Sequence, residues 1–143
     1  MEIAQIIANR ASGDVISCDV STPMRDAITL LASKRIGAVP VLQNGSVVGI
    51  FSERDVIYNL AKEGEACLSR SVGEVMAKPP ITIETHTHVY EALALMTRRR
   101  IRHLPVIENG AMIAFISIGD LVKSRIDEVE HEAEAMREYI QTA

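Results

Sequence analysis

A serine followed three residues later by an aspartate occurs twice in this chain, each time after an apolar run. The two pairs are Ser52 with Asp55 and Ser117 with Asp120. An ionised carboxylate beside a hydroxyl can bind the hydroxyls of a ribose, because it accepts several charge-assisted hydrogen bonds. The same spacing also suits a helix start, where Ser caps backbone amides and Asp meets the positive end of the helix dipole. One pair alone leaves both interpretations open, and the recurrence favours ligand binding.

Basic side chains stand close to both pairs. Arg102 and His103 precede a predicted hairpin whose turn is Asn109-Gly110, a dipeptide that readily adopts the positive φ angles of a two-residue turn. An antiparallel hairpin brings its two ends together, which places both side chains beside the second Ser-Asp pair. Arg54 lies within the first pair, at an expected helix N-terminus that can itself attract an anion. Together these groups suit a ligand with both phosphate and ribose.

The hairpin belongs to an internal duplication. Residues 36–45 (IGAVPVLQNG) align without a gap with residues 101–110 (IRHLPVIENG), and the two Ser-Asp pairs then coincide. Such a repeat is one supersecondary unit that packs against its copy. A chain of 143 residues buries enough surface for one stable domain, whereas either half alone would be marginal. We therefore expect the two halves to pack as one unit.

Each repeat is predicted to fold as β-α-β-β-α, which makes this an α/β (α+β) protein. In the first repeat a strand at residues 15–20 precedes a helix that is capped by Thr22 and has Pro23 at its first position. Thr87 takes the place of Thr22 in the second repeat, after a strand at residues 81–84. The expected organisation is an N-terminal helix that breaks at residues 11–14 (1–14), repeat 1 (15–62), a linker with a short lead-in helix (63–76), repeat 2 (77–125) and a C-terminal amphipathic helix (126–143).

The C-terminal helix carries an apolar seam. Its members recur at alternating spacings of four and three residues, with charged residues elsewhere, and they are Val122, Ile126, Val129, Ala133, Met136 and Ile140. The seam either folds back on its own domain or pairs with another chain. Its length favours a homodimer.

The composition argues against several other functions. A net charge of −4 disfavours nucleic-acid binding, which needs a broad excess of Lys and Arg. No apolar run is long enough to span a membrane. Two cysteines without metal-ligand or redox spacing, and no signal peptide, predict a cytoplasmic protein. His86 and His88 lack the further ligands of a metal site, and no phosphate-binding glycine loop or nucleophile motif is present, so we expect neither a metal nor an enzyme.

The segments VPVLQNGSVVGIFSERD and LPVIENGAMIAFISIGD, with VGEVM before the second repeat, resemble a pair of CBS domains, the Bateman module. The resemblance covers residues 15–125, and the whole chain resembles stand-alone bacterial CBS-pair proteins of the signal-transduction type. It implies repeats packed with pseudo-two-fold symmetry around two clefts, each able to hold AMP, ADP, ATP, NAD(H) or S-adenosylmethionine. It also implies a non-catalytic protein that requires no cofactor and signals energy or redox state to a protein effector. The alternative is an interaction or dimerisation module with vestigial clefts.

The resemblance assigns the ribose and the adenine to particular residues. In the family the Ser-Asp pairs hold ribose, which implies that role for both pairs here. Adenine is contacted by the first strand and by the residues before the hairpin of the opposite repeat. These positions are Ile16, Ile36 and Gly37 for one cleft, and Ile81, Ile101 and Arg102 for the other.

The phosphate contacts implied by the resemblance differ between the repeats. Arg102-His103 resembles the His-Arg pair that contacts phosphate in the gamma subunit of AMP-activated protein kinase, and Arg54 is the other candidate. Gly37-Ala38, at the same place in repeat 1, completes the expected ligand contacts but carries no charge. In repeat 2, Ala114 also replaces Gly49. We therefore expect two unequal clefts, each with a cation from one repeat only.

Overall fold

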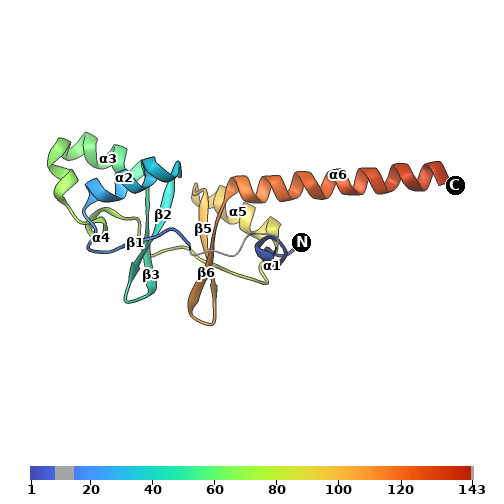
Figure 1. Cartoon of the computed structure of the whole chain (residues 1–143), viewed down its shortest axis with the longest axis horizontal. Coiled ribbons are helices and arrows are strands. Elements are labelled where there is room, and N and C mark those ends of the chain that lie inside the picture. Colours follow the sequence, from blue (N-terminus) through green and yellow to red (C-terminus); the bar gives the residue numbers. More distant parts are fainter. Residues whose placement is uncertain (9–14, 143) are drawn as a thin grey trace.

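The chain folds into two β-α-β-β-α repeats joined by a linker, as the sequence predicted (Figure 1). The structure is a computed structural model that describes residues 1–8 and 15–142, so the expected helix break at residues 11–14 lies outside the described residues. Helix α1 (Ile3–Ala8) comes first. Repeat 1 then contains β1 (Cys18–Asp19), α2 (Met24–Lys34), β2 (Ala38–Gln43), β3 (Ser46–Ser52) and α3 (Glu53–Glu63).

The linker and the second repeat follow. The linker contains the 3-10 helix η1 (Gly64–Ser69) and the short helix α4 (Val72–Val75). Repeat 2 contains β4 (Ile83–Glu84), α5 (Val89–Arg99), β5 (His103–Glu108), β6 (Ala111–Ser117) and α6 (Ile118–Thr142). The predicted lead-in helix before repeat 2 therefore corresponds to α4.

Each repeat contains a three-stranded sheet built around its hairpin. β1 pairs in parallel with β2, which pairs antiparallel with β3, and β4, β5 and β6 repeat this arrangement. The turn residues Asn44 and Gly45 have φ angles of 52° and 81°, and Asn109 and Gly110 have 52° and 80°. These angles confirm the predicted two-residue turns, which Asn and Gly adopt at little steric cost. The two sheets meet where β3 contacts β6.

The first strand of each repeat is shorter than predicted. β1 and β4 contain two residues each, and β1 pairs Cys18 with Val41 and Asp19 with Leu42. Both strands lie at the edge of their sheet, and a turn follows at once. After β1 the amide of Val20 still donates to the carbonyl of Leu42 over 2.9 Å, and the chain turns there.

The predicted helix caps are wrong by one residue. Pro23 is the N-cap residue of α2, because its φ of −61° fits a helix but its ψ of 143° is extended. In repeat 2 the N-cap residue is His88, whose Nδ1 accepts a 3.1 Å bond from the amide two residues later. Thr22 and Thr87 belong instead to the preceding turns. The hydroxyl of Thr87, for example, accepts a 3.1 Å bond from the amide of Glu84.

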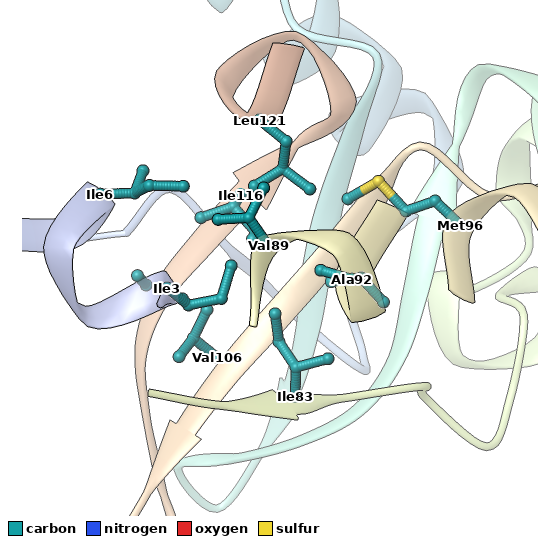
Figure 2. Close-up of a cluster of buried hydrophobic side chains, with 11 residues drawn as sticks. Ile3, Ile6, Ile83, Val89, Ala92, Met96, Val106, Ile116 and Leu121 are labelled. Carbon is teal, nitrogen blue, oxygen red and sulfur yellow. The ribbon is translucent and has the colours of Figure 1, made fainter. Parts of the chain in front are cut away.

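Each repeat has its own hydrophobic core, and each core contains a helix that precedes the other repeat. Ile3 and Ile6 of α1 lie in the core of repeat 2, among side chains of β4, α5, β5, β6 and α6 (Figure 2). Val72 and Val75 of α4 lie in the core of repeat 1, together with Cys67 of η1. The two lead-in helices are thus exchanged between the repeats.

Backbone hydrogen bonds fasten the exchanged helices at equivalent places. The amide of Ile3 donates to the carbonyl of Thr87 over 2.9 Å, and the amide of Val72 donates to the carbonyl of Thr22 over 2.7 Å. Since Thr22 and Thr87 are equivalent in the alignment, the two attachments follow the symmetry of the repeats.

Helix α6 continues far beyond repeat 2. It has 25 residues and projects away from both sheets (Figure 1). Leu121 near its start is buried, whereas residues 129–142 are all exposed. The alternative that the seam folds back on its own domain is therefore wrong. Within residues 1–8 and 15–142, no helix combines the length and the apolar character needed to cross a bilayer.

The close approach of the linker to β3 explains why Gly49 differs from its equivalent, Ala114. The backbones of Ile50 and Ala77 exchange two hydrogen bonds of 3.0 and 2.9 Å, which lays the linker across β3. A Cβ on Gly49 would lie 2.8 Å from the carbonyl oxygen of Ala77 and would also strike the side chain of Met76.

We expect Gly49→Ala to lower the free energy of unfolding by about 1–3 kcal/mol, because overpacking forces the linker backbone to move. Urea unfolding followed by circular dichroism measures this change. The matched control is Gly119→Ala, whose Cβ would meet only the Oγ of Ser117, at 3.5 Å, and which should be neutral or slightly stabilising. Equal midpoints for Gly49→Ala and the parent would contradict the close contact between the linker and β3.

Candidate functional site

A cleft of about 520 Å³ lies between the two repeats. It is bounded by the start of α3 in repeat 1, by the end of the linker and by the residues before β5 in repeat 2. Most residues proposed from the sequence line it, namely Gly37, Ala38, Ser52, Arg54, Asp55, Ile81, Ile101, Arg102 and His103. The structure therefore brings the first Ser-Asp pair together with the apolar and basic residues of the opposite repeat.

Four of the proposed residues do not line this cleft: Ile16, Ile36, Ser117 and Asp120. The resemblance assigned all four to the other cleft, and that assignment stays a prediction. Gly37 was assigned with Ile16 and Ile36 but lines the cleft described here. The reason is that Gly37 precedes β2 directly, and its carbonyl accepts a 3.0 Å bond from the amide of Glu53, at the cleft wall.

Ser52 and Asp55 form a capping box at the start of α3. The amide of Ser52 donates to Oδ2 of Asp55 over 2.8 Å, and the Ser52 hydroxyl donates to the same oxygen over 3.2 Å. Both bonds end on Oδ2, so Oδ1 takes part in neither. The helix-cap interpretation of this pair is thus confirmed as local structure. It leaves one carboxylate oxygen of a cleft residue for other donors.

The second pair shares with the first the bond from the serine amide to Oδ2 of the aspartate. The amide of Ser117 donates to Oδ2 of Asp120 over 2.7 Å, and the amide of Asp120 donates to Oγ of Ser117 over 3.1 Å. His103 is the antiparallel partner of Ser117, and the carbonyl of Arg102 accepts a 2.8 Å bond from the amide of Ile118. The two ends of the hairpin therefore lie together, as antiparallel pairing requires.

Burial raises the pKa of Asp55 above its ordinary value, although the hydrogen bonds from Ser52 and the charge of Arg54 act in the opposite direction. A carboxyl group with a raised pKa in the folded state loses its contribution to stability as the pH rises through that pKa. At neutral pH the ionised carboxylate of Asp55 is therefore partly desolvated by the protein around it. A ligand that donates hydrogen bonds to it would stabilise it there.

His103 lies half-buried at the start of β5, and its ring stacks on Phe115 with centroids 5.3 Å apart. Burial lowers the pKa of His103, and the nearby charge of Arg102 adds to this effect. The carboxylates of Asp120 and Glu53 act in the opposite direction on this pKa. The imidazole is therefore neutral at pH 7, and a bound phosphate would favour its protonation.

Arg54 connects the two repeats across the cleft. Its Nη1 donates to the carbonyl oxygen of Arg100 over 3.1 Å. Arg54 of repeat 1 and Arg100, Arg102 and His103 of repeat 2 all line the same cleft. The expectation that each cleft draws its cation from one repeat is thus wrong here, because α3 of one repeat faces the start of β5 in the other.

The family model of the CBS domain matches residues 3–62 and 72–127. This chain belongs to the CBS-domain family. The mitochondrial CBS domain-containing protein CBSX3 of Arabidopsis thaliana is 34% identical over 136 residues, which are 92% of this chain and 66% of CBSX3. This chain thus spans slightly less than two thirds of that relative.

Solved CBS structures share the fold. A CBS-domain containing protein from Agrobacterium tumefaciens is 34% identical, with a TM-score of 0.83 over 87% of this chain and 99% of that chain. CBSX2, solved in complex with AMP, is 23% identical, with a TM-score of 0.74 over 88% of this chain and 96% of that chain. The predicted tandem CBS fold is therefore confirmed.

Sequence reasoning missed part of the cleft of this CBS pair, namely Ile50, Glu53, Ile57, Tyr58, Ala77, Pro79, Pro80 and Arg100. Helical spacing could have found Tyr58, which lies one turn after Arg54. The Pro79-Pro80 dipeptide could have been found too, because it leads directly into Ile81. No sequence pattern indicated Ile50 and Ala77, which meet only through the bridge between β3 and the linker.

The lowered pKa of His103 predicts a pH-dependent stability. The unfolded imidazole takes up a proton near pH 6.5 and the folded one resists it, so stability falls as the pH drops below about 6.5. We expect His103→Gln to remove this loss. The difference in urea midpoint between the parent and His103→Gln should then be largest near neutral pH and shrink toward about pH 5. A difference that stays constant over this range would contradict the lowered pKa.

Proposed function

We propose that this chain is a non-catalytic regulatory module that binds an adenine nucleotide, such as AMP, ADP, ATP or NAD(H), in the cleft between its CBS repeats. The observation that carries the proposal is the set of groups on the walls of one cleft. Ser52 and Asp55 accept hydrogen bonds, Ile81 and Ile101 are apolar, and Arg102 is cationic. These groups match the ribose, the base and the phosphate of a single ligand.

The ribose is placed at the capping box. Its hydroxyls donate to Oδ1 of Asp55, while Oδ2 keeps its bonds to Ser52. A charge-assisted bond to a partly desolvated carboxylate is worth more than one in water. The adenine ring lies against Ile81 and Ile101, which are half-buried in the unliganded protein and gain further burial when the base binds.

The phosphates are placed beside Arg102 and His103, with Arg54 in reach from the opposite repeat. Arg54 is held by the carbonyl of Arg100, so a phosphate would compete with that bond. Because the ligand touches both repeats, it would favour one relative arrangement of the two. To act as a signal to a protein effector, the nucleotide must bind one arrangement better than the other. The AMP complex of CBSX2, which has the same fold, supports a nucleotide of this class.

Asp55→Asn tests the ribose contact. Asn keeps an acceptor for the helix cap but loses the charge, so we expect the affinity for AMP to fall about tenfold or more, as when a hydrogen bond to a charged group is lost. Isothermal titration calorimetry and a thermal-shift panel of AMP, ADP, ATP, NADH and S-adenosylmethionine measure this loss.

The control for Asp55→Asn is Asp127→Asn, which removes the same charge from an exposed position on α6 and should bind like the parent. Protein freed of carried-over ligand must be used. A parent protein whose melting temperature does not change with any of these compounds would refute the proposal.

Arg102→Ala tests the phosphate contact separately. We expect weaker binding of AMP and ATP but unchanged binding of adenosine, because this proposal assigns the guanidinium to the phosphate and the apolar contacts of the base to Ile81 and Ile101. The comparison of AMP with adenosine in the same calorimetric experiment is its own control. An equal loss for both compounds would mean that Arg102 supports the cleft structure rather than the phosphate.

A second function is favoured by one observation, the long exposed seam of α6. In this alternative the chain is an interaction module and its clefts are vestigial. Deletion of residues 127–143 separates the two functions. The shortened chain should lose association under both functions. Under the first proposal it binds nucleotide as tightly as the full-length chain, whereas under the alternative neither the full-length nor the shortened chain binds nucleotide.

A further inference from the structure

Helix α6 changes its surroundings along its length. In its first half Leu121 is buried, and the guanidinium of Arg125 lies 5.2 Å from the centroid of the Tyr90 ring and 3.2 Å from the carboxylate of Glu128. Leu121 and Arg125 thus lie on the stripe that faces the body of the protein. From residue 129 onward every described residue is exposed, and the helix projects from the body (Figure 1).

The apolar seam of α6 lies on a different stripe from the body contacts. Val122, Ile126 and Val129 are 45–52% exposed, and Met136 and Ile140 are 60% and 66% exposed. Their alternation of four and three residues assigns Ile126, Ala133 and Ile140 to the a positions of a heptad, and Val122, Val129 and Met136 to the d positions. The seam therefore has the spacing that places apolar residues at both core positions of a coiled coil.

The charges that flank the seam distinguish the possible orientations of two copies of α6. In a parallel, in-register pair, a g residue faces the e residue five positions later on the other helix. Glu132 would then face Arg137 of a second copy, and Arg125, which also contacts Tyr90 of its own chain, would lie opposite Glu130. Symmetry doubles both contacts, so all four flanking pairs are attractive.

In an antiparallel pair centred on the exposed seam, the flanking charges repel each other. This pairing places Glu130 against Glu130 of the second copy and Glu132 against Glu132, and it sets Lys123 against Arg137. Like charges at these positions disfavour that arrangement. The sequence of α6 is therefore complementary to itself in one orientation only.

We propose that α6 forms a parallel, in-register two-stranded coiled coil with α6 of a second copy of this chain. The seam supplies the buried core, and the Arg125–Glu130 and Glu132–Arg137 pairs set the orientation and the register. The two CBS pairs of the dimer then lie at the same end of the coiled coil. This interface does not depend on whether the clefts bind nucleotide.

A charge swap on the full-length chain tests the register. Sedimentation equilibrium of the parent should show a monomer of 15.7 kDa in equilibrium with a dimer. Glu132→Arg and Arg137→Glu should each weaken the dimer about tenfold, because each turns two attractive pairs into repulsive ones. The double variant restores the attraction and should return to near the parent value. Both residues are exposed and far from the body, so neither change threatens folding.

The matched control is Glu138→Arg, which makes the same charge change on the side of α6 opposite the seam and should leave the dimer unchanged. A parent that stays monomeric at its highest soluble concentration would overturn the proposal and leave the seam to a different protein. A double variant as weak as the single variants would overturn the register.

Cysteine cross-linking tests the orientation. The native Cys18 and Cys67 are buried, so an introduced thiol is the reactive one. Met136→Cys should form a disulfide-linked dimer under mild oxidation, because equivalent d residues face each other in a parallel pair, and Glu134→Cys on the outer side should not. Preferential linkage in a mixture of Ile126→Cys and Met136→Cys chains, with little linkage of Met136→Cys alone, would show an antiparallel pair and overturn the proposal.

Discussion

The exchange of lead-in helices holds the two CBS repeats in their relative positions. Ile3 and Ile6 complete the core of repeat 2, and Val72 and Val75 complete the core of repeat 1. Each helix is also bonded through its backbone to the turn before the first long helix of the other repeat. Neither core is closed by its own repeat alone, so the repeats must fold against each other. The cleft, whose walls come from both repeats, is defined by that constraint.

The Ser-Asp pairs have a structural role that does not exclude a binding role. Both pairs cap a helix, and in each pair the aspartate accepts the serine amide through Oδ2. An Asn could fill the same cap without a charge. At Asp55 the chain instead keeps a carboxylate whose pKa burial raises, which costs stability at neutral pH. Local rules of helix capping thus do not account for the charge at this cleft wall.

The two repeats share an architecture but differ in charge. Repeat 2 begins its hairpin with Arg102-His103 where repeat 1 has Gly37-Ala38, and all four residues line the same cleft. The wall from repeat 1 thus has small uncharged residues at this place, whereas the wall from repeat 2 has the charged Arg102 beside His103. Burial lowers the pKa of His103, so its imidazole adds little positive charge to this wall at neutral pH.

The sequence by itself determined the features that depend on neighbouring residues. These are the duplication, the two Asn-Gly hairpins, the position of the Ser-Asp pairs and the heptad seam of α6, because turn chemistry and periodicity act over a few residues. Tertiary structure alone decided the features that join distant segments. It paired Ile3 with Thr87, crossed β3 with the linker at Ala77, and set Arg54 against Arg100 in the cleft. The helix caps are Pro23 and His88 and not the predicted Thr22 and Thr87, whose carbonyls accept bonds from the exchanged helices. No local pattern carries that information, since each of these contacts depends on how one repeat packs on the other.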